Sequence, residues 1–71
     1  MDRATQDLLL ELQAGPTDLA KLVGAVLRRD RPTVAVEADA MARWNRDAAS
    51  HWQLVKAWLT ARGVRVTVVS R

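Results

Sequence analysis

The sequence contains no cysteine and a single histidine. Without cysteine there is no disulfide framework and no thiolate metal site. One histidine alone does not make a plausible zinc site. We therefore expect neither a bound metal nor a cofactor. Tyrosine and phenylalanine are also absent, so three tryptophans supply all of the aromatic surface.

Motifs that carry catalysis are missing as well. There is no phosphate-binding Walker loop and no dinucleotide fingerprint. Ser50 stands beside His51, but adjacent positions on a helix do not face each other and so make no catalytic pair. We expect a protein that is not an enzyme and takes no small-molecule substrate.

Long apolar runs are missing too. No run approaches the roughly 20 residues that a membrane span needs. The opening residues, "MDRATQDLLLELQ", lack the continuous apolar core of a signal peptide. These patterns predict a soluble, cytoplasmic chain that makes no contact with a membrane.

What the chain does have is positive charge. Eleven Lys and Arg against eight Asp and Glu give a net charge of +3, and nine of the eleven cations are arginine. Residues after position 27 hold nine of the cations and only four of the acids. This excess is either an ordinary solvated surface or a surface for a polyanion, since arginine bonds phosphate with two nitrogens.

Helical and extended patterns alternate along the chain. They predict helices over 4–13 and 18–29, a strand over 33–36, helical sequence over 37–62 and a strand over 64–70. Gly15 is expected in the left-handed conformation that ends a helix, and Thr17 as the next N-cap. Gly24 predicts close approach of a neighbouring helix, and Gly63 a helix end. A single domain is expected over 1–71, with an accessory helix at 1–15 and a core at 17–71.

Residues 37–62 allow two interpretations. One stripe would run along a continuous helix, formed by Met41, Trp44, Ala48, Trp52, Val55 and Leu59. Such a helix, about 37 Å long over 38–62, would overhang either short strand and leave tryptophan uncovered. A break at 45–47, with Asn ending one helix and Asp capping the next, avoids this. We therefore expect two helices, at 37–44 and 47–62.

The core is expected to form where the apolar stripes of these helices meet. The residues expected in it are Leu19, Leu22, Val23, Val26, Trp52, Val55 and Leu59. The tryptophans could alternatively form a platform on which single-stranded bases stack. Their place in the apolar stripe favours the core.

With the break, residues 18–69 resemble a winged helix-turn-helix DNA-binding domain. The matching segments are "DLAKLVGAVLRR", "TVAV", "EADAMARW", "NRD" and "AASHWQLVKAWLTARG" running into "VRVTVV". Arg46 stands where the family favours glycine, and no second wing strand follows. The resemblance implies a mostly helical α+β fold that reads the major groove of duplex DNA with its third helix.

The resemblance also assigns DNA contacts to particular residues. Ala48, Ala49, Ser50 and Gln53 would meet base edges. Arg43, Arg46 and Lys56 would bind phosphates, and Arg65 at the start of the last strand is a further candidate. The implied role is a transcriptional regulator or an accessory factor of a phage or plasmid.

A protein-interaction module is the alternative. Strand 64–70 is apolar on one face, and the short strand 33–36 cannot cover both of its edges. We expect this strand to pair with a partner protein or with a second copy, which makes a homodimer.

Overall fold

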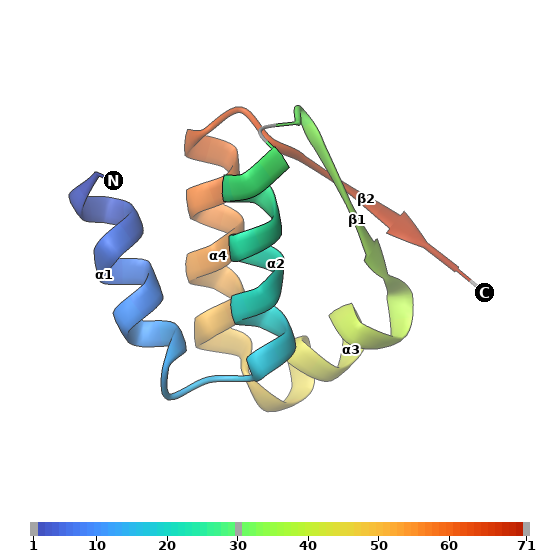
Figure 1. The fold of residues 1–71 in the computed structure, drawn as a ribbon. Helices are drawn as coiled ribbons and strands as arrows, with labels where there is room; N and C mark the ends of the chain where they lie inside the picture. Colours follow the sequence, from blue (N-terminus) through green and yellow to red (C-terminus); the bar gives the residue numbers. More distant parts are fainter. Residues whose placement is uncertain (1, 30, 71) are drawn as a thin grey trace.

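The computed structural model describes residues 2–29 and 31–70. The described chain is mostly helical with a small sheet (Figure 1), which confirms the expected α+β class. Its elements are α1 (Arg3–Leu12), α2 (Thr17–Arg29), β1 (Thr33–Glu37), α3 (Ala38–Asp47), α4 (Ala49–Ala61) and β2 (Arg65–Val69). Helices and strands therefore follow each other in the order expected from the apolar spacing.

The two strands run parallel. Thr33 lies opposite Arg65, and Glu37 lies opposite Val69. Parallel neighbours need a long crossover between them, and α3 and α4 provide it. The helices lie on one side of the strand pair (Figure 1), and the side chains of Thr33, Ala35 and Thr67 on the other face are exposed. Parallel sheets are usually covered on both faces, so this small sheet is covered less than most.

The core lies where α4 is packed between α1, α2 and the sheet. Its buried residues are Leu8, Leu12, Leu19, Val23, Val26, Val36, Trp44, Trp52, Val55, Trp58 and Leu59. Six of the seven expected core residues are buried, and Leu22 is partly buried at its edge. The three tryptophans are only 1–7% exposed. They fill the core, and the alternative that they form a stacking platform is wrong.

The predicted break between two helices is confirmed, but its predicted position is wrong. The break falls at Ala48, and α3 runs through Asn45 and Asp47. Neither residue caps a helix end, and no side chain caps the start of α4. Ala48 instead donates its N–H to the Trp44 carbonyl at 2.8 Å and accepts from Trp52 N–H at 2.9 Å.

Packing explains why the chain turns at Ala48. Trp44 and Trp52 are eight positions apart, which is about 12 Å along a straight helix. In the structure their ring centroids are 5.1 Å apart. The turn brings both rings into one core, and Ala48 is small enough to be buried at 9% exposure beside them. Tertiary packing rather than local capping therefore sets the position of the break.

Three local expectations, for Gly15, Gly24 and Thr17, are corrected by the structure. Only Gly63 has a positive φ, of 74°, as expected for a residue that ends a helix. Gly15 does not, and its place is explained by His51, whose ring would lie 3.1 Å from an added Cβ. Gly24 meets no neighbouring helix, since Arg28 of its own helix is the nearest side chain. Thr17 is the first residue of α2 rather than its N-cap.

A buried hydrogen-bonded chain attaches α1 to α4. The Thr5 hydroxyl is fully buried, accepts a hydrogen bond from Trp58 Nε1 at 2.9 Å and donates to Asp2 at 2.5 Å. A buried indole N–H without a partner would cost about 1–3 kcal/mol. This contact, with Leu8 and Leu12 in the core, makes α1 part of the packed structure.

Candidate nucleic-acid interface

The first turns of α4 carry the residues expected to meet base edges. Ala49, Ser50 and Gln53 are all exposed there. Ala48, which was also expected to meet a base edge, is buried in the turn before α4, so that expectation is wrong. The three exposed residues are separated from the core side of α4 because Trp52 and Val55 point inward. The structure therefore brings these three residues together on one accessible face. The face itself is uncharged, so any attraction for phosphate has to come from neighbouring cations.

Arg43 lies on the side of α3 nearest to α2. Its guanidinium is 2.8 Å from an Asp18 carboxylate oxygen, and Trp44 Nε1 donates to the same carboxylate at 3.1 Å. Burial of the Asp18 carboxyl raises its pKa. The hydrogen bonds from Trp44 and Arg43, together with the Arg43 charge, lower the pKa by more than burial raises it, so the pKa lies below its usual value. Arg43 thus links α3 to α2, and its charge is largely compensated.

Arg46 and Lys56 are also engaged within the protein. Arg46 pairs with its neighbour Asp47 at 3.1 Å. The Lys56 ammonium lies 5.5 Å from the centre of the Trp52 ring, in a cation–π contact. Two of the three cations expected beside α4 therefore sit in ion pairs, and the third rests on an aromatic ring. Arg65 is remote from this face, because it follows the opposite end of α4.

Five exposed arginines gather at that opposite end. There α2 and α4 finish and both strands begin (Figure 1). We call this group the arginine-rich end; it consists of Arg28, Arg29, Arg31, Arg62 and Arg65. Arg31 and Arg62 line a common groove of about 430 Å³ between the two turns that lead into the strands.

The helix dipole accounts for part of this arrangement. A cation in the last turn of a helix is favourable by about 0.3–1 kcal/mol, which suits Arg28 and Arg29. Arg62 stacks on Trp58, with the guanidinium carbon 4.9 Å from the ring centre. Arg31 precedes β1 and Arg65 is the first residue of β2, so neither is stabilised by a helix dipole. Within the described residues, none of the five forms an ion pair.

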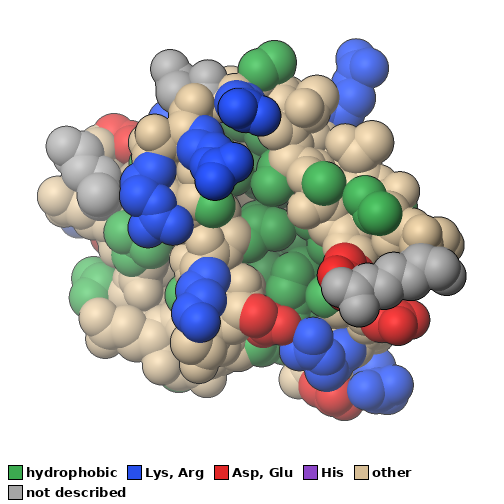
Figure 2. Space-filling model, turned by 45° about the vertical axis from the view of Figure 1, so that its right-hand side comes forward, with side chains coloured by type: hydrophobic (Ala, Val, Ile, Leu, Met, Phe, Trp, Pro, Cys, Tyr) green, Lys and Arg blue, Asp and Glu red, His purple; other side chains and the backbone are tan. Residues whose placement is uncertain are grey.

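The acids lie mostly elsewhere. Asp18, Glu37, Asp39 and Asp47 belong to the end where α2 and α4 begin and β1 finishes. Asp2 is nearer the arginines: the Thr5 hydrogen bond lowers its pKa most, and the Arg62 charge makes a smaller contribution. Figure 2 shows several cationic side chains on one side of a hollow apolar surface, and red and blue side chains mixed below it. Among the described residues, the side chains at the two ends of the molecule therefore differ in charge.

Four residues of the arginine-rich end were not among the expected contacts. The sequence does carry a signal for three of them, because "RRDRP" concentrates cations in one short turn. Arg62 joins them only through the parallel pairing of the strands, which brings the two turns side by side. Antiparallel pairing would have placed the starts of the strands at opposite ends.

Metal sites and membrane spans are two other features that a chain of this kind could carry. Within residues 2–29 and 31–70, no group of three metal-ligating side chains is placed to hold an ion. The described helices include none with the length and apolarity to cross a membrane. Comparison of the chain with protein-family models, with curated proteins and with solved structures finds no match.

Proposed function

We propose that this domain is a non-enzymatic protein that binds double-stranded DNA. The observation that carries the proposal is the arginine-rich end, where five exposed guanidinium groups converge from three segments of the chain. Duplex DNA carries a dense row of phosphates, and arginine contacts to them provide most of the attraction. A surface of this kind would place the domain on a duplex without reading its sequence.

Base reading is the finer part of the proposal. It assigns sequence preference to Ala49, Ser50 and Gln53 on α4, as in a winged helix-turn-helix domain. In support, α3 and α4 form two helices joined by a tight turn, and these three side chains are exposed. The strand pair is parallel and offers no hairpin wing, so α4 would have to read bases unaided. These three residues lie at the start of α4 and the arginine-rich end follows its last turn, about 20 Å away along 13 residues. One duplex would therefore have to lie along α4 to contact both. A transcriptional regulator or a phage- or plasmid-type accessory factor would use such contacts.

The test is the salt dependence of binding to a labelled duplex, measured by fluorescence anisotropy. Each phosphate contact contributes about 0.9 to the slope of log affinity against log salt, so five contacts predict a slope of about −4.5. In the same assay Gln53→Ala should change the order of preference among duplexes while the slope stays constant. No binding at about 50 mM salt would reject the proposal and favour a protein-interaction module.

A homodimer formed along β2 is a second candidate. Val68 and Val69 are 54% and 44% exposed, and within the described chain β2 pairs only with β1. An exposed apolar edge strand tends to find a partner strand. Two copies paired there would present two α4 helices to a symmetric DNA site.

Light scattering at tens of micromolar should then give twice the monomer mass of 7.9 kDa. Val68→Lys, which puts a charge on the exposed strand, should restore the monomer. A monomer mass for the parent protein would exclude the dimer and leave β2 available for another partner.

A further inference from the structure

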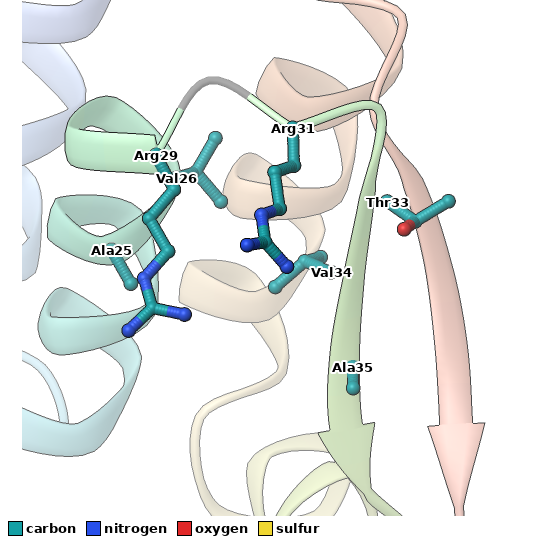
Figure 3. Close-up of a pocket in the computed structure, with 7 residues that line it drawn as sticks. All are labelled: Ala25, Val26, Arg29, Arg31, Thr33, Val34 and Ala35. Atoms are coloured by element: carbon teal, nitrogen blue, oxygen red, sulfur yellow. The ribbon is translucent and has the colours of Figure 1, made fainter.

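An apolar groove runs between α2 and β1. Its volume is about 360 Å³, and its lining residues are Ala25, Val26, Arg29, Arg31, Thr33, Val34 and Ala35. Figure 3 shows the two arginine side chains reaching into the space between helix and strand, from the end of α2 and the start of β1. We call this space the α2–β1 groove. It has an apolar floor, over which two arginine side chains extend from the end where α2 finishes and β1 begins.

The groove follows the outer edge of β1. Pro32 accepts a hydrogen bond from Arg65 N–H at 2.8 Å, and the Val34 carbonyl accepts one from the Thr67 hydroxyl. Carbonyl and amide groups alternate in direction along a strand. The backbone groups of Thr33 and Ala35 therefore point away from β2 and into the groove. In the described part of the chain, no third strand pairs with them.

An open strand edge beside an apolar groove fits an extended peptide. Such a peptide adds a strand through main-chain hydrogen bonds, and alternate side chains fill the neighbouring hollow. Here Val26 and Val34 would receive its apolar side chains. The arginines decide which way the peptide runs, because both lie where β1 begins.

From these features, the geometry points to a groove that binds the C-terminal segment of an acidic partner protein. We propose that this segment lies antiparallel to β1, with its terminal carboxylate and a neighbouring acidic side chain at Arg29 and Arg31. A parallel peptide would bring a positively charged amino terminus to the same guanidinium groups and be repelled. Carboxylate–guanidinium hydrogen bonds are charge-assisted and frequently bidentate, so the chain end would be recognised directly.

The proposal does not depend on DNA binding, although both partners would use Arg29 and Arg31. The variant Ala35→Pro distinguishes peptide binding from DNA binding. Proline removes one amide donor at the open edge, and an edge strand tolerates it where the N–H points outward. All five arginines remain in place. This variant should lose the peptide and bind a duplex as the parent does.

The experiment uses a fluorescein-labelled hexapeptide, Thr-Val-Thr-Val-Glu-Glu, in two forms. One has a free carboxylate and the other a C-terminal amide. The free acid should bind the parent at least about ten-fold more tightly, since the amide loses a charge-assisted contact. A third peptide with lysine in place of both glutamates should not bind. Anisotropy gives the three affinities, and a duplex titration of each protein runs in parallel.

Equal binding of acid and amide peptides, or no binding of either, would overturn the proposal. Unchanged peptide binding by Ala35→Pro would overturn the strand addition. Circular dichroism checks that this variant is folded. If it is not, Ala25→Leu takes its place, because it narrows the groove from α2 and leaves β1 and all five arginines unsubstituted. It should weaken the peptide and leave the duplex affinity unchanged.

Discussion

Replacing Trp52 with alanine should lower the free energy of unfolding by about 3–5 kcal/mol. Trp52 is 1% exposed, and its ring contacts that of Trp44 across the turn at Ala48. Removing it would leave a cavity in the centre of the core and deprive Lys56 of its cation–π partner. At roughly 0.05–0.15 kcal/mol per residue, a chain of 71 residues has about 4–11 kcal/mol of stability, so this one change removes a large part of it. The urea midpoint of the variant should therefore lie well below that of the parent.

Leu54→Ala on the same helix is the matched control. Leu54 is 46% exposed, so its loss should change stability by no more than about 0.5–1 kcal/mol. Urea titrations followed by circular dichroism compare the two variants with the parent. A loss below about 1 kcal/mol for Trp52→Ala would contradict its place at the centre of the core.

Most of the fold follows from local pattern. The stripe of apolar residues in α2 and the β-branched runs in both strands located these elements to within two residues. The helix break was anticipated from the need to cover Trp44 and Trp52, and that need is what the structure satisfies. The position of the break was predicted wrongly. Asn45 and Asp47 are good capping residues on their own, but they lie within a helix that Trp44 holds against the core. A capping interaction contributes about 1 kcal/mol, which is less than the free energy gained by burying one tryptophan side chain.

The candidate nucleic-acid interface is harder to predict from the sequence than the fold. Pattern alone does not say whether two strands pair parallel or antiparallel, and that choice decides whether Arg31 and Arg62 meet. Ion pairs across elements are equally hidden: nothing near Arg43 in the sequence indicates Asp18, which lies on another helix. Ala49, Ser50 and Gln53 on α4 are exposed as expected, because they occupy the side away from Trp52 and Val55. Helical periodicity is sufficient for that inference.

Removing two charges from the arginine-rich end should weaken duplex binding far more than removing two charges elsewhere. In Arg28→Gln/Arg31→Gln, two phosphate contacts are lost and the salt slope should become shallower by about 1.8. Extrapolated from about 1 M to about 0.1 M salt, this corresponds to a roughly 60-fold loss of affinity. Glutamine keeps much of the side-chain stem, so packing should be preserved. Both arginines are exposed, and thermal stability should therefore stay near that of the parent.

The control is Arg3→Gln/Arg46→Gln, which also removes two charges from a net charge of +3. Arg3 and Arg46 are well exposed, and each is near an acid on its own helix. If position matters, this variant should bind the duplex within about two-fold of the parent, at an unchanged slope. Equal losses in the two variants would show that net charge alone attracts DNA and would remove the arginine-rich end as the interface. A slope reduced by about 0.9 in the control alone would assign a phosphate contact to Arg46, because Arg3 lies on α1 and Arg46 beside the start of α4. The duplex would then be held at the face of Ala49, Ser50 and Gln53 and not at the arginine-rich end.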